Sequence, residues 1–290
     1  MRKILITGAN SYIGTSFEKW VANSSDKYYV DTIDMMGDLW KDKDFSEFDV
    51  VFHVAGIAHI KETEKNQDLY YNVNRDLAFE TAKKAKVEGV KQFIFLSSMS
   101  VYGIENGIID SNTPLKPNSA YGKSKLQAEE LIKTLEGDSF KVAILRPPMV
   151  YGKGCKGNYP RLAKLALNAP AFPDVDNERS MIYIDNLCEF VRLLIHDCVS
   201  GLYFPQNNEY VKTSEMVRLI AEAHGKKLKC IKMFNLGIQL GLGLSRTVRK
   251  VFGSFMYDKR LPGGTDSVIN GKKVDYQTCS FENSIRMTEK

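Results

Sequence analysis

Short apolar runs recur along the first half of the chain and alternate with amphipathic stretches. The runs are rich in β-branched residues and lie at 3–7, 28–33, 49–55, 92–98 and 141–147. Helical patterns separate several of them, most clearly at 68–88 and 120–136. Continuous apolar strands interleaved with helices are typical of a parallel sheet that is covered on both faces and has right-handed crossovers. The pattern therefore predicts an α/β fold with a doubly wound parallel sheet.

The end of each predicted strand is where chemistry is expected, because ligands of such sheets bind beyond the carboxyl ends of the strands. After the first strand comes "TGANSYIG", which places Gly8 and Gly14 before a helix that begins at about Ile13. A glycine-rich turn leading into a helix exposes N–H groups and a positive dipole end, which suit a pyrophosphate. An ordinary tight turn gives the same pattern.

An aspartate follows the second predicted strand, twenty residues after Gly14. Asp34 could accept hydrogen bonds from both hydroxyls of an adenosine ribose and would repel a 2′-phosphate, which favours NAD over NADP. Asp31 is a rival for this role, and either aspartate could simply be a solvated turn residue.

The stretch "SAYGKSKLQAEE" at 119–130 predicts a helix with Ser119 as its N-cap. Tyr121 and Lys125 stand four residues apart and therefore share a face. An isolated pair of this kind usually lines a wet surface, so its meaning depends on the rest of the chain.

The composition describes a globular protein whose basic excess is local. The chain has 290 residues, 43% of them hydrophobic, and a formal net charge of +5. Residues 226–260 hold nine Lys or Arg and a single acid, Asp258. No recognition module or aromatic-basic platform accompanies this charge, so we expect no nucleic-acid partner.

The stretch 233–256 joins an apolar half, broken by Gly237, Gly241 and Gly243, to a basic half. One interpretation is peripheral contact with an anionic membrane. The other, which the glycines favour because they weaken a free-standing helix, is a helix packed on the protein's own C-terminal part.

The five cysteines are an odd number without Cys-x-x-Cys spacing, which argues against a disulfide framework and against a zinc site. We therefore predict no metal. The apolar opening breaks at Thr7 and Gly8, too early for a signal peptide, and no apolar stretch reaches the length of a membrane span. We expect a soluble, cytoplasmic protein.

Four motifs at the strand ends, taken together, carry a family resemblance. The third strand ends in "HVAGIAH", the fourth in "LSSMSVYG", the next helix opens with "YGKSK", and the fifth strand runs into "LRPPMVYGKG". In this order the set resembles the extended short-chain dehydrogenase/reductase family, in its nucleotide-sugar epimerase/dehydratase branch, over about residues 1–190. The resemblance implies a Rossmann-like NAD-binding domain at 1–155, joined by sheet elements from about 180–205, and a mainly substrate-binding lobe at 156–290.

The resemblance implies a catalytic role for three residues. Tyr121 would exchange a proton with a sugar hydroxyl, with Lys125 and oxidised nicotinamide lowering its pKa from about 10. Lys125 would also bond the nicotinamide ribose, and Ser98 would hold the substrate oxygen. Without the other two residues, Ser98 would be interpreted as a strand-end serine bonded to nearby backbone.

The resemblance also implies a set of NAD contacts, including Asp44 and Phe45 at the adenine and Asn74 as a brace of the site. Ser11 departs from the family, which usually has a third glycine there, and its β-carbon needs a compatible backbone angle. The full set is Gly8, Asn10, Ser11, Tyr12, Ile13, Gly14, Asp34, Asp44, Phe45, Val54, Ala55, Gly56, Asn74, Tyr121, Lys125 and Pro148.

For the substrate, the resemblance implies that Arg179 grips the diphosphate of a nucleotide-sugar, although a surface salt bridge is the alternative. Asn158, at the start of a helix, would contact the substrate, together with Ser98 and Ser100. Met149 stands where many epimerases have an asparagine, and the stretch from Arg161 to Arg179 is short, which indicates a compact lobe.

The two residues after Ser98 limit which type of reaction is expected. Dehydratases of this branch usually carry acids there, whereas this chain has Met99 and Ser100. A UDP-sugar 4-epimerase that retains NAD is the favoured interpretation, with a 4-keto-6-deoxy-sugar reductase of surface-polysaccharide biosynthesis as the alternative. A non-catalytic dinucleotide-binding scaffold or sensor is a third, although such proteins usually lack the tyrosine or the lysine.

The resemblance further implies a homodimer in which the helices at 68–88 and 120–136 form a four-helix bundle with their symmetry mates. Four positions on the first helix are compatible with this contact but could equally face the sheet: Leu69, Val73, Leu77 and Thr81.

Overall fold

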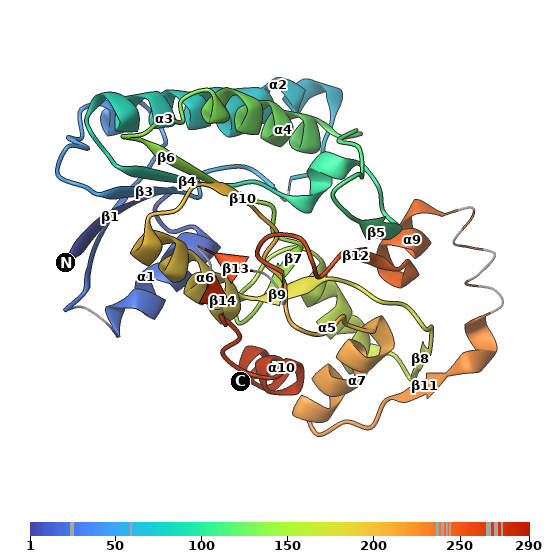
Figure 1. The fold of residues 1–290 in the computed structure, drawn as a ribbon. Coiled ribbons are helices and arrows are strands. Elements are labelled where there is room, and N and C mark those ends of the chain that lie inside the picture. The colour runs from blue at the N-terminus through green and yellow to red at the C-terminus, as the bar shows by residue number, and fades with distance from the viewer. Residues whose placement is uncertain are drawn as a thin grey trace.

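A six-stranded, fully parallel sheet in the order β2-β1-β3-β4-β6-β10 forms the centre of the protein (Figure 1). The computed structural model describes residues 1–23, 26–58, 60–235, 238, 241, 243, 245–264, 268–269, 272–273 and 275–290. The strands are β1 (Arg2–Thr7), β2 (Tyr28–Ile33), β3 (Val50–His53), β4 (Gln92–Leu96), β6 (Lys141–Leu145) and β10 (Gly201–Tyr203). All five predicted strands and the doubly wound fold are confirmed.

Alternate residues of each strand pack into two different cores. On β1, Ile4 and Ile6 belong to one buried cluster and Leu5 belongs to the other. On β4, Ile94 joins the first cluster and Phe93 the second. Because strand side chains point alternately to opposite faces, both faces of the sheet are covered, which explains why the strands appear in the sequence as continuous apolar runs.

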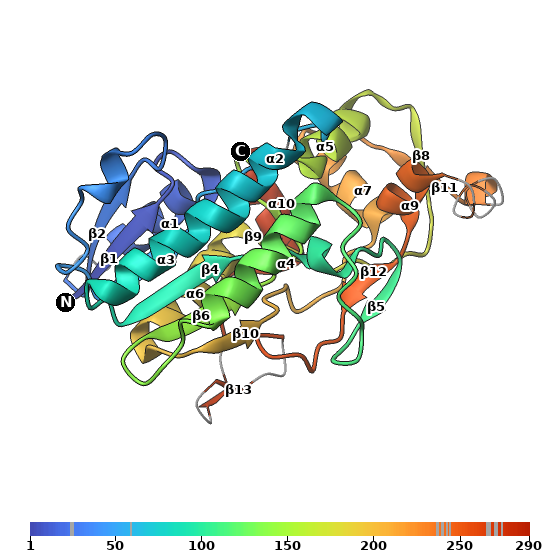
Figure 2. The same ribbon diagram turned by 90° about the horizontal axis from the view of Figure 1, so that it is seen from above.

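Helices form a layer on each face of the sheet. One layer holds α1 (Tyr12–Ala22) and α6 (Ile184–Asp197), and the other holds α2 (Gln67–Tyr71), α3 (Leu77–Val87) and α4 (Ala120–Lys133) (Figures 1 and 2). The predicted helix at 68–88 is present, but its hydrogen bonding changes to a π-helical turn, η3 (Asn72–Asp76), between α2 and α3. Such turns inside α-helices frequently occur at functional sites.

The C-terminal half is built from two-stranded pairs and short helices. The pairs are β7 (Met149–Tyr151) with β9 (Met181–Tyr183), β8 (Ala171–Pro173) with β11 (Lys229–Ile231), β5 (Gly107–Ile109) with β12 (Phe255–Tyr257), and β13 (Val268–Ile269) with β14 (Lys272–Lys273). The helices are α5 (Asn158–Asn168), α7 (Thr213–Ala223), α9 (Arg246–Phe252) and α10 (Phe281–Glu289). Short 3-10 turns are η1 (Leu39–Lys41), η2 (Glu64–Asn66), η4 (Met99–Tyr102) and η5 (Lys232–Phe234).

The later part of the chain contributes one strand to the main sheet. Of the region 180–205, α6 and β10 join the sheet layers, whereas β9 pairs with β7 outside the main sheet. The first and second halves are nevertheless interlocked, because β5 follows the fourth strand in sequence and pairs with β12 near the C-terminus.

The predicted helical segment at 233–256 lies only partly within the described residues. Its described basic part forms α9, where the Phe252 ring lies 5.6 Å from the Phe172 ring and Val251 packs on the core. The chain then enters β12 at Phe255, so the helix does not extend to 256. This part packs on the protein's own C-terminal half, as the second interpretation expects. Within the described ranges, no helix combines the length and apolarity needed to cross a membrane.

The start of α1 approaches the sheet so closely that only glycine fits at position 14. A methyl group on Gly14 would lie 2.6 Å from Ser11 Oγ, 3.0 Å from Ile6 Cγ2 and 3.2 Å from Val54 Cγ2. Packed protein interiors absorb such crowding only by shifting backbone or side chains.

We predict that Gly14→Ala lowers the free energy of unfolding by about 1 to 2 kcal/mol, because overpacking outweighs the better helix propensity of alanine. The matched control is Gly137→Ala, where an added methyl group meets nothing within 4 Å. Urea denaturation of both variants measures the difference. Equal stabilities would show that α1 can move away from the sheet at no cost.

Candidate active site

The predicted cofactor residues gather at the carboxyl ends of β1, β2 and β3. The strand order reverses between β1 and β3, and crevices at such reversals are where doubly wound sheets bind their ligands. The turn after β1 lies against the chain after β3: a methyl group on Gly8 would lie 3.0 Å from the N and Cα atoms of Ala55. Gly8 has φ +97, which suits glycine.

The turn ends in a helix N-terminus capped by Ser11. Ser11 has φ −69 and ψ 145, an extended conformation that any residue adopts, so the departure from glycine carries no backbone strain. Its Oγ accepts a hydrogen bond from Gly14 N at 3.2 Å, while Asn10 takes the left-handed conformation at φ +61. The remaining first-turn N–H groups of α1 and the close glycine approach fit a dinucleotide pyrophosphate. Tyr12 and Ile13 are half-buried in this first turn.

The two aspartates of the second strand have different partners. Asp31 lies within β2 and forms an ion pair with Lys43 at 2.8 Å. Asp34 follows the strand, is exposed, and accepts a hydrogen bond from Met36 N at 3.0 Å. It adjoins the glycine turn, because Gly8 N and Ala9 N both donate to the carbonyl of Ile33. This placement favours Asp34 over Asp31 as the ribose ligand.

Only one member of the predicted adenine pair is available to a ligand. Asp44 is exposed, and hydrogen bonds from Ser46 lower the pKa of its carboxyl. Phe45 is fully buried in the core, its N–H donates to Glu88 Oε2 at 2.6 Å, and its carbonyl accepts from Phe48 N. The prediction that Phe45 meets the adenine is therefore not supported by its position; the residue is a core residue beneath this edge.

Asn74 lies in the π-helical turn and bonds the loop after β3. Its Oδ1 accepts from Ile57 N at 2.9 Å, and its Nδ2 donates to Ile57 O at 3.0 Å and to Ser124 Oγ at 3.3 Å. Gly56 lies beside it, and a methyl group there would be 2.9 Å from Asn74 Oδ1 and 3.3 Å from Lys125 Nζ. Asn74 therefore ties the loop after β3 to helix α4, the bracing geometry expected of it.

Ser98 and Tyr121 meet between η4 and α4. Ser98 is the N-cap of η4: its Oγ accepts from Ser100 N at 3.1 Å and lies 3.2 Å from Ser100 Oγ. Ser98 interacts with the Tyr121 hydroxyl and lowers its pKa, and the Tyr70 ring packs edge-on against Tyr121 at 6.3 Å. The two predicted proton-handling groups therefore lie near each other.

Lys125 is buried between the ends of β3 and β4. Its Nζ donates to Leu96 O at 2.8 Å and lies 4.7 Å from the centre of the Phe95 ring. Burial lowers the pKa of Lys125 to about 8, and Glu129 opposes this shift. The ammonium group is therefore held at the strand ends, next to Gly56, rather than at the protein surface.

The expected acidity of Tyr121 is not produced by the protein residues. Burial raises the pKa of Tyr121, the hydrogen bond with Ser98 lowers it, and Tyr70 raises it further. Lys125 is not among the groups that shift this pKa, and its ammonium bonds the carbonyl of Leu96. That Lys125 and oxidised nicotinamide together lower the pKa of Tyr121 stays a prediction for the cofactor-bound site.

The predicted substrate residues lie on several elements. Ser100 is exposed beside Ser98, and Asn158 is the exposed first residue of α5. Pro148, predicted as a cofactor contact, is buried after β6. Arg179 is half-buried and donates from Nη1 to Gly253 O at 2.7 Å. Burial lowers the pKa of Arg179, and Glu105 opposes this. The alternative of a surface salt bridge does not describe this arginine, which bonds a backbone carbonyl.

Sequence reasoning missed the residues that hold these groups in place. Both carboxylate oxygens of Glu62 accept from Ala120 N at 3.0 Å, which fixes the loop after β3 on the N-terminus of α4. Ser97, Glu129 and Arg146 form a buried network behind Lys125. Glu129 could have been found from its spacing, since it continues the 121, 125 series on one helix face.

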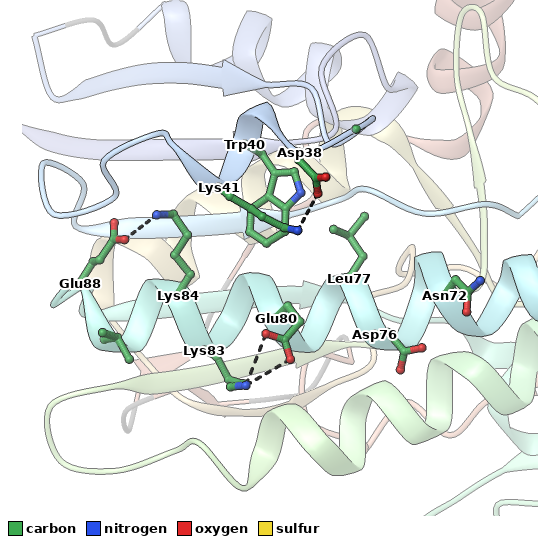
Figure 3. Close-up of a pocket in the computed structure, with 12 residues that line it drawn as sticks. Asp38, Trp40, Lys41, Asn72, Asp76, Leu77, Glu80, Lys83, Lys84 and Glu88 are labelled. Atoms are coloured by element: carbon green, nitrogen blue, oxygen red, sulfur yellow. Dashed lines mark hydrogen bonds and ion pairs between the residues drawn. The ribbon is translucent and has the colours of Figure 1, made fainter.

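A groove of about 720 Å³ lies outside this site, between α3 and the η1 turn (Figure 3). Ion pairs join Asp38 to Lys41 at 2.6 Å and Glu80 to Lys83 at 3.2 Å along it. None of its described lining residues is a predicted catalytic residue. We therefore place the chemistry at the strand ends, where the functional side chains converge.

Comparisons with known proteins agree with this geometry. A model of the NAD dependent epimerase/dehydratase family matches residues 4–204. UDP-glucose 4-epimerase of Vibrio cholerae is 30% identical over 267 residues, which cover 80% of this chain and 81% of that protein. An Escherichia coli O157:H7 protein, N-acetyl-alpha-D-glucosaminyl-diphospho-ditrans,octacis-undecaprenol 4-epimerase, is 29% identical over 257 residues, covering 82% of this chain and 76% of its own.

Among solved structures, the UDP-glucuronic acid 4-epimerase of Bacillus cereus in complex with NAD superposes with a TM-score of 0.74. It is 20% identical and covers 99% of this chain and 95% of its own. At this identity the superposition shows that the two proteins share a fold.

We predict that Lys125→Met changes the pH dependence of stability. The pKa of Lys125 falls from 10.5 to about 8 in the folded protein. Between these values the unfolded chain binds a proton that the folded chain lacks, so Lys125 makes wild-type stability rise with pH. The stability of Lys125→Met relative to wild type should therefore fall by about 2 to 3 kcal/mol between about pH 7 and pH 11.

Urea denaturation across this pH range measures the difference. Lys123→Met, at an exposed position of the same helix, is the matched control and should show a constant difference from wild type. A constant difference for Lys125→Met as well would mean that Lys125 is not a buried charge.

Proposed function

Because the chain belongs to the NAD dependent epimerase/dehydratase family, we propose that it is an NAD-dependent 4-epimerase of a UDP-sugar. The observation that carries the proposal is the placement of Tyr121 and the buried ammonium of Lys125 one helical turn apart on α4, with Ser98 close enough to Tyr121 to lower its pKa. The Vibrio cholerae relative named as a UDP-glucose 4-epimerase supports the choice of substrate class.

The residues at the ends of β1, β2 and β3 suit NAD. The glycine turn and first turn of α1 would hold its pyrophosphate, Asp34 its adenosine ribose, and Lys125 its nicotinamide ribose. When bound, NAD accepts a hydride from the sugar carbon, returns it, and adds a positive charge to the site. The remaining contacts would come from Asn10, Ser11, Asp44, Val54, Ala55, Gly56, Asn74 and Pro148.

The side chains of this chain supply the proton chemistry. Ser98 would hold the oxygen of the reacting sugar hydroxyl, and Tyr121 would take up its proton and later return it. Tyr121 starts from a pKa that burial has raised, so it acts as a base only when positive charge accumulates beside it. Oxidised nicotinamide would supply such a charge, so the cofactor would help Tyr121 to act as a base.

Substrate selection rests on the C-terminal half of the chain. Arg179 would bind the diphosphate with the part of its guanidinium group that does not bond Gly253 O. Asn158 and Ser100, both exposed, would contact the sugar-nucleotide. Dehydratases of this branch usually have acidic residues at the two positions after Ser98, where they serve the elimination step. This chain has Met99 and Ser100 there, which argues against dehydration.

A 4-ketoreductase would use the same Ser98, Tyr121 and Lys125, and differs in consuming the cofactor instead of retaining it. A binding scaffold without turnover would have no need of all three groups in contact. Each alternative therefore predicts a different result when the protein is incubated with nucleotide-sugars.

We predict that the purified protein interconverts UDP-glucose and UDP-galactose, or another UDP-sugar pair, without net change in nicotinamide absorbance. Tyr121→Phe should keep NAD binding and lower turnover by about 100-fold or more, because the proton-transfer group is lost. Product analysis and absorbance measure the two outcomes. Net cofactor consumption with a 4-keto sugar would show a reductase, and unchanged turnover in Tyr121→Phe would contradict the mechanism.

We also propose that the protein is a homodimer that pairs α3 and α4 with those of a second copy. Leu69 supports this because it is 44% exposed on α2. Thr81 does not, since its side chain is fully buried within the chain and its hydroxyl donates to Leu77 O. Thr81 thus takes the other orientation that the sequence left open for these positions, toward the interior of its own chain.

Light scattering tests the dimer. Wild type should have twice the chain mass, and Leu69→Asp should shift the protein toward the monomer, because a charge in an apolar contact is unfavourable. Met233→Asp, which alters an exposed apolar residue of the C-terminal half, is the control and should leave the mass unchanged. A monomeric wild type would contradict the proposal.

A further inference from the structure

Three consecutive residues at the end of β4 interact with three residues on one face of α4. Leu96 accepts from Lys125 through its carbonyl, and Ser98 lies close enough to Tyr121 to lower its pKa. Between them, Ser97 donates from its hydroxyl to Glu129. The helix residues are spaced four apart, so they lie in a row on the same face. The row contains the two proposed catalytic groups of α4 and one residue without an assigned role.

Glu129 is held by an arginine from the next strand end. Arg146 follows β6, and its Nε lies 3.0 and 3.1 Å from the two carboxylate oxygens of Glu129, with Nη2 at 2.5 Å from Oε2. Glu129 is 4% exposed and Arg146 is 5% exposed. A bidentate pair in such a dry environment fixes geometry closely, because both charges depend on each other for solvation.

The pair also reaches the far end of η4 and the C-terminal half. Arg146 Nη1 donates to Tyr102 OH at 2.9 Å, and Tyr102 ends the turn that Ser98 caps. Tyr257 of β12 donates from its hydroxyl to Arg146 O at 2.9 Å. The ion pair therefore touches both ends of the segment that carries Ser98 and Ser100.

We propose that Glu129, held by Ser97 and Arg146, is a positioning residue for the reaction: it fixes α4 on the end of β4 and keeps Lys125 charged. The inference rests on the proposed function, since it assigns to Glu129 the placement of Tyr121 and Lys125 against Ser98. Glu129 itself does not touch the substrate or the cofactor.

The charges around Lys125 explain why Glu129 matters electrostatically. Glu129 acts on it from α4, and Lys125 in turn acts on His53 at the end of β3; Arg146, after β6, and Tyr102, in η4, lie on the far side of Glu129. His53 is neutral near pH 7, because burial lowers its pKa to about 3. Glu129 opposes the effect of burial on Lys125, whereas loss of Glu129 would leave the Arg146 cation unpaired nearby. Both effects would make Lys125 release its proton more easily.

Glu129→Gln tests the proposal, because glutamine keeps the size and part of the hydrogen bonding but removes the charge. The expected result is a fall in kcat of about tenfold or more and a shift of the alkaline limb of the pH-rate profile downward by about one pH unit. Glu136→Gln, exposed just beyond the same helix, is the matched control and should change neither.

A second measurement does not depend on turnover. Urea denaturation measures how the free energy of unfolding depends on pH for Glu129→Gln and for the double variant Glu129→Gln/Lys125→Met. The difference between the two shows the pH range in which Lys125 makes stability rise. This range should begin about one pH unit lower than the range obtained from wild type and Lys125→Met. If the wild type turns over no UDP-sugar, the proposed function fails and this comparison alone decides the inference.

A purely structural role would give another pattern. The proposal would be overturned if Glu129→Gln were only less stable. In that case the alkaline limb of the pH-rate profile, the pH range of the Lys125 effect on stability and the kcat per folded molecule would all stay unchanged. Should Glu129→Gln not fold, Ser97→Ala keeps the ion pair and removes one hydrogen bond. It should lower kcat several-fold with KM unchanged, and an unchanged kcat would overturn the proposal.

Discussion

The attachment of helix α4 to the end of strand β4 is the constraint on which the proposed site depends. One face of the helix provides Tyr121, Lys125 and Glu129, and the strand end provides a carbonyl and two hydroxyls to meet them. Proton transfer requires heavy atoms within hydrogen-bond reach, so a small shift of the helix along the strand would separate Tyr121 from Ser98. The packing of one helix thus sets the geometry of the chemistry.

This attachment uses charged groups that a core would otherwise exclude. Lys125 is 5% exposed, and its ammonium bonds one carbonyl and faces an aromatic ring. Burying an ammonium under these conditions costs stability, as the lowered pKa of Lys125 shows. A hydrophobic residue would fit this position with less penalty, so the retention of lysine indicates a functional requirement and not a structural one.

The site also depends on chain segments far apart in sequence. Tyr257 of β12 donates a hydrogen bond to the carbonyl of Arg146, the partner of Glu129 in the ion pair. Strand β12 pairs with β5, which comes shortly after η4, the turn that Ser98 caps. Arg179 is held on the same C-terminal segment through the carbonyl of Gly253. Residues that the sequence suggests form a separate lobe therefore contact the strand ends of the parallel sheet.

The sequence by itself determined the sheet, because buried parallel strands need continuous apolar runs, and all five appear within a few residues of their predicted bounds. It also placed Tyr121 and Lys125 on one face of a helix, since a helix repeat makes i and i+4 neighbours, while their roles came from the family resemblance. Tertiary structure decided the features that depend on distant contacts: the burial that raises the pKa of Tyr121, the core position of Phe45, and the pairing of Glu129 with Arg146. Burial and ion pairing depend on which distant segments meet in space, and these contacts cannot be predicted from the local spacing of residues.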